Sequence, residues 1–226
     1  MLVYSFASWY ATGMKKILCI VFISAFVLCD FFAQDALVLY RTGRNKEQAG
    51  HTEDANTYYT QAVNVCKNEL LSNDKNIESY VVMCWALFRL KRYDEVVSNS
   101  AKALKINPNE YRIIENLGET YFYLDRYSES LRNLERYVDA IPNGDRTATA
   151  YFFMGEIYRI EGKNHHADVA YSHAVKKEPT IALWWYRLGI AREKAGNPEK
   201  AKEAYKKALA LKPSFHEAEQ ALSRLG

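Results

Sequence analysis

The side chains best suited to chemistry are a few histidines, and their spacing does not match a catalytic or metal-binding pattern. His216 and Glu217 begin a string of the form HExxQ, in which Gln220 stands where a zinc protease needs its second histidine. His166 and His173 are seven residues apart and could share one face of a helix, but no cysteine or carboxylate set completes a metal cage around them. We therefore expect no metal site and no cofactor.

Other catalytic patterns are missing as well. The sequence has no phosphate-binding loop, no dinucleotide-binding glycine pattern and no Gly-x-Ser-x-Gly nucleophile motif. We therefore expect that the protein is not an enzyme. Cys66 and Cys84 form either a disulfide or two free buried thiols, and we favour free thiols because Cys84 occupies a packing position of the repeat described below.

The composition is that of a globular protein. Of the 226 residues, 49% are hydrophobic and 25% are charged, and the net charge is +3. This apolar fraction excludes a disordered chain, and four cysteines are too few for a scaffold built from disulfides. The nearly balanced charge gives no reason to expect binding to nucleic acid.

Residues 1–33 have the pattern of a secretory signal peptide. A basic pair, Lys15 and Lys16, precedes a run at 17–28 that is apolar apart from one serine, and the small residue Ala33 precedes the expected cleavage point. The apolar run is shorter than the ~20 residues that a membrane-spanning helix needs. We expect a cleaved leader and export of the remaining chain.

Two alternatives to a cleaved leader remain open. The leader could be retained as a membrane anchor, or Cys29 could carry a lipid, although the bulky Leu28 before it fits a lipidation signal poorly. We expect contact with a membrane only in these two cases. Residues 1–13 carry no charge, so we expect the natural start at Met14.

A period of 34 residues organises the chain after the leader. Large apolar residues recur mostly at unit positions 4, 7, 11 and 24, small residues at 8, 20 and 27, glycine at 15 and proline at 32. The units cover residues 36–69, 77–110, 111–144, 148–181 and 182–215, with insertions at 70–76 and 145–147 and a tail at 216–226. The first unit is the least regular, since Lys67 replaces its proline.

The spacing within each unit predicts a pair of helices. Apolar residues three or four apart form one helical face, and small residues at positions 8 and 20 let the two helices approach closely. Glycine at position 15 closes the first helix, and proline at position 32 ends the second. One helical pair cannot bury its apolar face alone, so neighbouring pairs must stack. The tail supplies Ala218, Leu222 and Leu225 to cover the last pair.

This pattern resembles the tetratricopeptide repeat family, whose signature is W-x2-L-G-x2-Y, A-x3-F and P. The fifth unit carries it as Trp185, Leu188, Gly189, Ala201 and Pro213. The resemblance covers nearly all of residues 36–226. It implies an all-α fold, a right-handed α-solenoid of about five helix-turn-helix units with a C-terminal capping helix.

The resemblance also implies a concave groove lined by the first helices, chiefly at positions 2, 5, 9, 12 and 13. The groove residues carried over in this way are Val81, Trp85, Phe88, Arg89, Arg112, Glu115, Glu119, Phe122, Tyr123, Phe152, Glu156, Arg159 and Tyr186, with Tyr40 and Arg44 from the first unit. Large aromatics among charges of both signs suit a peptide or protein, and they do not form the one-signed track that nucleic acid needs. The aromatics could instead fill the seam between neighbouring first helices.

Trp184 stands at position 3, where the family usually has a small residue. It either packs between units or forms a patch for self-association. For the whole protein we expect an exported, non-enzymatic scaffold of the bacterial periplasm or cell envelope that binds a peptide or protein segment in its groove. The alternative function is a small-molecule or lipid-binding accessory of an envelope transporter, which would need a closed apolar pocket.

Overall fold

The computed structural model describes residues 35–226, and this part of the chain is entirely helices and connecting loops. The predicted leader, Met14 and Cys29 lie outside the described residues. The helices are α2 (Ala36–Gln48), α3 (Thr52–Ser72), α4 (Ile77–Arg89), α5 (Tyr93–Ile106), α6 (Tyr111–Tyr123), α7 (Tyr127–Ala140), α8 (Thr147–Ile160), α9 (Asn164–Lys177), α10 (Ala182–Lys194), α11 (Pro198–Leu211) and α12 (His216–Arg224).

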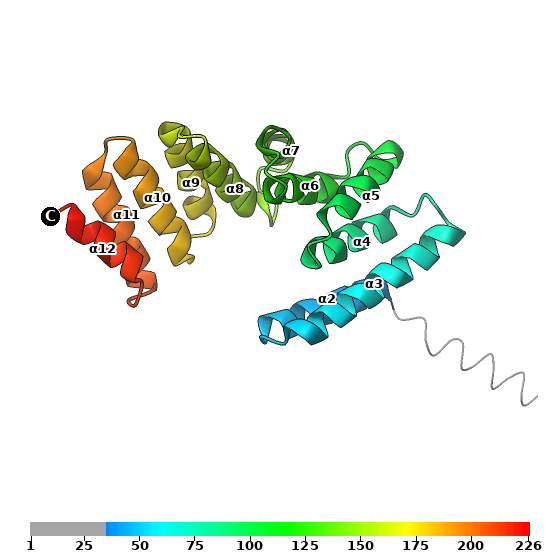
Figure 1. Cartoon of the computed structure of the whole chain (residues 1–226). Helices are drawn as coiled ribbons and strands as arrows, with labels where there is room; N and C mark the ends of the chain where they lie inside the picture. Colours follow the sequence, from blue (N-terminus) through cyan, green and yellow to red (C-terminus); the bar gives the residue numbers. More distant parts are fainter. Residues whose placement is uncertain (1–34) are drawn as a thin grey trace, which may run out of the picture.

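The helices stack in pairs along one direction. Each helix packs against the next one in the chain, and the first helices α2, α4, α6 and α8 also touch their neighbours. Figure 1 shows the pairs following one another in an arc, with α12 and the C-terminus at the end opposite to α2 and α3. The predicted α-solenoid is confirmed. No helix within residues 35–226 is long and apolar enough to cross a membrane.

The first helix of every unit is followed by a residue in the left-handed backbone region at position 15. The φ values are 83° at Gly50, 58° at Lys91, 56° at Asp125, 72° at Gly162 and 81° at Gly196. Glycine adopts this conformation without steric cost, whereas residues with a Cβ atom pay such a cost. The turn is therefore the same in all five units, although only three of them carry the expected glycine.

The second helices end where the prolines predict, except in the first unit. Pro108, Pro142, Pro179 and Pro213 each stand two residues beyond the end of a helix. The first unit has Lys67 in place of proline, and α3 continues to Ser72. Residues 70–72, assigned from the sequence to an insertion, are therefore part of this longer helix.

Cys66 and Cys84 lie in the core as free thiols, in agreement with the favoured alternative. The Sγ atom of Cys84 is 3.5 Å from the hydroxyl oxygen of Ser100. Burial raises the pKa of Cys66 and of Cys84 to about 12. Thiolates, rather than thiols, are the reactive form, so both side chains act as small packing residues.

The C-terminal tail covers the last unit as predicted. In α12, Ala218 and Ala221 are buried, and Leu222 and Leu225 pack partly buried beside Tyr205 of α11. The amphipathic tail therefore removes the apolar face of α10 and α11 from water, as a terminal cap of a solenoid must.

Trp184 fills the space between the fourth and fifth units. Its side chain is buried, and its ring stacks on that of Phe152 with 5.0 Å between centroids and 13° between planes. Of the two roles predicted for Trp184, the structure therefore shows packing between units and not an exposed patch for self-association.

Candidate protein-binding groove

The first three units enclose a hollow of about 220 Å³ on the side lined by the first helices. We call it the groove hollow. Its lining residues are Tyr40 of α2, Trp85 of α4, Arg112 and Glu115 of α6, Tyr137 of α7, and Arg146 just before α8. Four of the six are residues that the sequence assigned to the groove.

Aromatic rings form one wall of the groove hollow. The centroids of Tyr40 and Trp85 are 5.6 Å apart with 33° between their planes, and both side chains are half-buried. Tyr40 is supported from behind by Tyr59, 5.8 Å away. Half-buried aromatics keep part of their apolar surface available, which is what a binding partner can cover.

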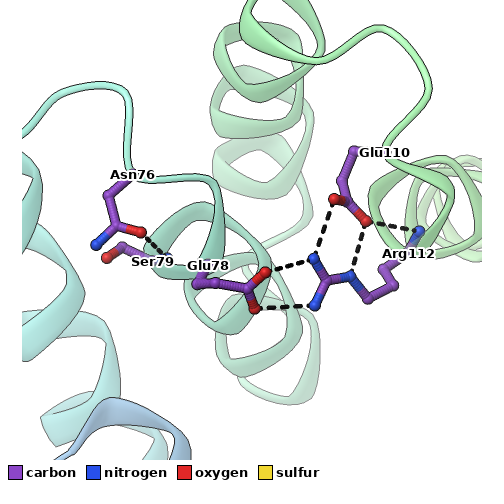
Figure 2. A network of polar contacts seen from close by, with 5 residues as sticks. All are labelled: Asn76, Glu78, Ser79, Glu110 and Arg112. Carbon is purple, nitrogen blue, oxygen red and sulfur yellow. Dashed lines mark hydrogen bonds and ion pairs between the residues drawn. The ribbon is translucent and has the colours of Figure 1, made fainter.

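Arg112 joins the second and third units at the rim of the groove hollow. Figure 2 shows its guanidinium between two carboxylates, donating to both oxygens of Glu78 at 2.7 and 2.9 Å and to both oxygens of Glu110 at 2.7 and 3.0 Å. These hydrogen bonds lower the pKa of Glu78. The same figure shows Asn76, whose side chain caps the start of α4 by accepting from the backbone N–H of Ser79.

Two buried carboxylates of α6 contact Arg146, and one of them, Glu115, lines the groove hollow. Glu115 and Glu119 both have side chains that are 6% exposed, and Arg146 donates through Nε to Glu115 at 3.0 Å and through Nη2 to Glu119. Burial and the neighbouring charge of Glu119 raise the pKa of Glu115 well above its ordinary value. Arg146 partly offsets this effect, because its positive charge and hydrogen bond favour the ionised form of Glu115.

Every junction between units carries a similar ion pair. In each case the carboxylate belongs to the earlier unit. The arginine belongs to the next unit, except that Arg146 lies in the insertion 145–147 and Arg224 in the C-terminal tail. The pairs are Glu47 with Arg89, Glu78 with Arg112, Glu115 and Glu119 with Arg146, Glu156 with Arg187, and Glu193 with Arg224. We refer to these pairs as the junction pairs.

The burial of several predicted groove residues corrects the expectation that they face an open surface. Val81 is 0% exposed because α4 is packed between α2, α3, α5 and α6. Glu115, Glu119 and Glu156 are buried, and Arg89 is engaged with Glu47. These side chains hold the units together, and their charges are satisfied within the protein.

A second group of predicted residues forms an aromatic cluster at the turns of the second to fourth units. Phe88 meets Tyr123 edge-on at 5.7 Å, and Phe122 meets Phe153 at 5.0 Å. Tyr93 stacks on Tyr123 at 5.4 Å. The cluster fills the seam between units, yet Tyr123 is 49% exposed at its edge.

The predicted residues of the fourth and fifth units serve mainly in packing. Phe152 lies under Trp184, and Tyr186 lies against Tyr205 and Phe215 at 5.9 and 5.0 Å. Glu156 accepts hydrogen bonds from Tyr171 and from Arg159. Phe152, Arg159 and Tyr186 are half-buried and lie outside the groove hollow, whose predicted lining residues all come from the first three units.

Two lining residues were missed by the sequence reasoning. Tyr137 stands at position 27, a position expected only to pack within a unit, and Arg146 lies in the insertion 145–147, outside the repeat numbering. The sequence did contain a hint of Arg146. Glu115 and Glu119 are two acids one helical turn apart, and such a pair needs a cation nearby.

The described residues contain no cluster of three or more His, Cys, Asp or Glu side chains that could hold a metal ion. The site has neither a nucleophile next to a base nor a phosphate cradle. Its chemistry is that of non-covalent contact through aromatic faces and charged rims.

Comparison with known proteins assigns the repeat. The family model described as "Tetratricopeptide repeat" matches residues 182–215, the fifth unit. The fifth unit is thus similar to a tetratricopeptide repeat. Among curated proteins, the BBSome complex member BBS4 of Bos taurus is 27% identical over 122 residues, which are 50% of this chain and 23% of that protein. The matched part of this chain therefore spans about a quarter of the length of that relative.

Solved structures show the same fold. MamA 41-end from Desulfovibrio magneticus RS-1 is 22% identical, with a TM-score of 0.62 over 80% of this chain and 96% of the MamA chain. YrrB, described as a TPR protein with an unusual peptide-binding site, is 21% identical, with a TM-score of 0.57 over 84% of this chain and 92% of YrrB.

Proposed function

We propose that this tetratricopeptide repeat protein is a non-enzymatic scaffold that binds a peptide or protein segment in its concave groove. The observation that carries the proposal is the groove hollow, in which Tyr40 and Trp85 from two units face charged side chains from a third. A partner bound in this hollow would contact three units at once. Its affinity would therefore depend on how the units are arranged as well as on single side chains.

The chemistry of the groove hollow suits an extended segment. Trp85 and Tyr40 offer apolar faces to an anchoring side chain. Arg146 is 49% exposed, and its hydrogen bonds to Glu115 and Glu119 leave further N–H donors for backbone carbonyls of a partner. A tetratricopeptide relative of known structure, YrrB, is described as having a peptide-binding site, which supports this mode of binding.

The groove hollow is less suited to the alternative function. A small-molecule site usually has about 300–1,000 Å³ and mostly apolar walls. The groove hollow has about 220 Å³ and is walled partly by two arginines and a glutamate. The peptide-binding function is therefore the one that we propose.

We further propose that binding takes place after export, in the bacterial periplasm or cell envelope. The proposal rests on the signal-peptide pattern of residues 1–33. N-terminal sequencing of the protein isolated from its cells tests it. A start at Gln34 supports simple export, a blocked start at Cys29 supports lipid attachment, and an intact leader contradicts export by cleavage.

To test the groove, a phage-displayed library of random twelve-residue peptides is selected on the wild-type protein. Replacing Trp85 by Ala removes most of one wall of the groove hollow, so we expect the selected peptides to bind at least about tenfold more weakly, as for a central aromatic anchor. Fluorescence anisotropy with a labelled peptide measures the change.

Trp185→Ala is the matched control, because Trp185 is also a half-buried tryptophan but packs at the junction of the fifth unit. Circular dichroism verifies that both variants keep their helices. If the peptides bind Trp85→Ala as well as they bind the wild type, the groove is not where this protein takes its partner.

A further inference from the structure

A larger hollow of about 330 Å³ lies in the fourth unit, between α8 and α9 and outside the groove positions. We call it the outer hollow. Its residues do not belong to the groove positions of the repeat. They are Tyr151, Met154 and Tyr158 from α8, and His165, His166, Val169, Ala170 and His173 from α9.

The outer hollow has an apolar floor and aromatic walls. Met154 and Ala170 are buried beneath it. His173 stacks on Tyr151 with 4.8 Å between ring centroids and 19° between planes. The rings of His166 and Tyr158 are tilted by 45°, with 5.3 Å between centroids. Val169 is 60% exposed between them. A valine this exposed, flanked by aromatic rings, leaves an apolar patch in water.

The other units act as an internal control, because they have the same helices at the same positions. Positions 18, 19, 22 and 26 hold Asp94, Glu95, Ser98 and Lys102 in the second unit, Ser128, Glu129, Arg132 and Arg136 in the third, and Glu199, Lys200, Glu203 and Lys207 in the fifth. The fourth unit has His165, His166, Val169 and His173 there. The repeat fold thus accepts charged side chains at this surface, and packing does not explain the apolar and aromatic character of the fourth unit.

A second hollow of about 290 Å³ adjoins the first and shares Val169 and His173 with it. Its other lining residues are Asp168, Ser172, Lys176, Arg192 and Lys200. Arg192 donates through Nε to Asp168 at 3.1 Å, so these two charges are matched. The ammonium groups of Lys176 and Lys200 then give this second hollow its net positive charge.

We infer that the two hollows together form a docking site for an acidic peptide segment of a partner protein. The segment would place an apolar side chain over Val169 and between the Tyr–His pairs, and its carboxylates beside Lys176 and Lys200. The site is separate from the groove and does not depend on the groove function.

The charge pattern favours a peptide over an anionic membrane. At the far end of the outer hollow the hydroxyl of Tyr158 lies 3.4 Å from Glu135, and Glu161 pairs with Lys163 nearby. Carboxylates therefore border the outer hollow at this end, where Lys194 is a further cation near His165 and His166, and Lys176 and Lys200 lie at the other end. A membrane surface would instead favour basic side chains spread around the apolar patch.

The test uses the full protein carrying Trp85→Ala as bait, so that peptides binding at the groove are disfavoured. From a phage-displayed library of random twelve-residue peptides, we expect enrichment of sequences in which Asp or Glu stands near a large apolar residue. The binding of an enriched peptide should fall at least about tenfold in Val169→Glu and in Lys176→Glu/Lys200→Glu. Val169→Glu should fold, because the fifth unit carries Glu203 at the same position.

Val38→Glu is the matched control, since Val38 of α2 is likewise an exposed valine, at 53%, and lies outside both hollows. Enrichment without acidic residues, or equal binding to Val169→Glu and Val38→Glu, would overturn the proposal. So would binding to phosphatidylglycerol vesicles that depends on Val169 while no acidic peptide is enriched. The groove is tested by peptides selected on the wild type, so either site can fail without the other.

Discussion

Single residues decide how closely the two helices of a unit approach. A Cβ atom added to Gly189 would lie 2.3 Å from the ring of Tyr205, which stands at position 24 of the same unit. The same close approach exists between Gly155 and Tyr171, at 2.6 Å. In the second unit position 8 is the larger Cys84, and position 24 is correspondingly the small Ser100. The space is shared between the two positions, so a change in one requires a change in the other.

Gly189→Ala should therefore destabilise the fold by about 1–3 kcal/mol, the usual cost of adding a methyl group to a filled core. The ring of Tyr205 cannot easily move aside, because its hydroxyl donates to Glu193 at 2.6 Å. Urea unfolding followed by circular dichroism measures the loss.

Gly196→Ala separates crowding from backbone strain in this experiment. Gly196 has a φ of 81° and no atom within 4 Å of an added Cβ, so its replacement brings strain alone, about 1 kcal/mol. A loss in Gly189→Ala no larger than in Gly196→Ala would contradict the packing explanation.

At the scale of the helix, the left-handed residue at position 15 is the feature that ends each first helix. Asp125 tolerates this backbone conformation, as short polar residues do, and its carboxylate accepts a hydrogen bond from Tyr127 at 2.7 Å. Lys91 adopts it with a φ of 58° and without such a bond among the described residues. The second unit therefore carries local strain that glycine would relieve.

Lys91→Gly should stabilise the protein by about 1 kcal/mol, which is the steric penalty of a left-handed residue less the added freedom of glycine in the unfolded chain. Thermal and urea unfolding of the variant and the wild type measure the gain. Lys163→Gly is the control, because Lys163 has a φ of −81° and gains nothing from glycine. Lower stability of Lys91→Gly would show that the lysine side chain contributes more than the strain removes.

For the whole molecule, the junction pairs determine how one unit meets the next. A solenoid is as stable as its units and their interfaces together, and each interface here includes an arginine placed on a carboxylate of the preceding unit. The junction of the third and fourth units differs, because three extra residues bring Arg146 onto two buried acids.

The raised pKa of Glu115 gives this junction a pH dependence with a defined sign. Because the pKa of Glu115 is raised in the folded protein, Glu115 holds its proton to higher pH there than in the unfolded chain, which releases it at about pH 4.3. The favourable contribution is thus complete at low pH and is lost as pH rises through the raised pKa. Glu115→Gln imitates the protonated side chain, so its stability relative to the wild type should increase between pH 5 and pH 8.

Urea unfolding at several pH values measures this difference. Glu129→Gln is the control, because Arg126 lowers the pKa of the partly exposed Glu129. Replacing this carboxylate should therefore not stabilise the protein at high pH. A gap between Glu115→Gln and the wild type that stays constant from pH 5 to pH 8 would show that Glu115 does not titrate as its surroundings indicate.

The sequence by itself determined the helices, their pairing and their ends. Gly162, Gly196 and the prolines at position 32 act within one turn of the chain, and the 34-residue period places each apolar face without knowledge of distant residues. Local signals of this kind also identified Trp85, Phe122 and Tyr123 as aromatics on the first helices. Lys91 and Asp125 show that the turn persists where the glycine signal is absent, since the stacking of units enforces it.

Only the tertiary structure decided which groove positions remain open. Val81, Glu119 and Glu156 stand at groove positions but are buried, and Arg146 reaches the groove hollow from outside the repeat. The outer hollow also becomes visible only when α8 and α9 bring their histidines and tyrosines together. Exposure depends on how far neighbouring units rotate and which side chains meet across a junction, and these contacts link residues about 30 or more positions apart that no local pattern relates.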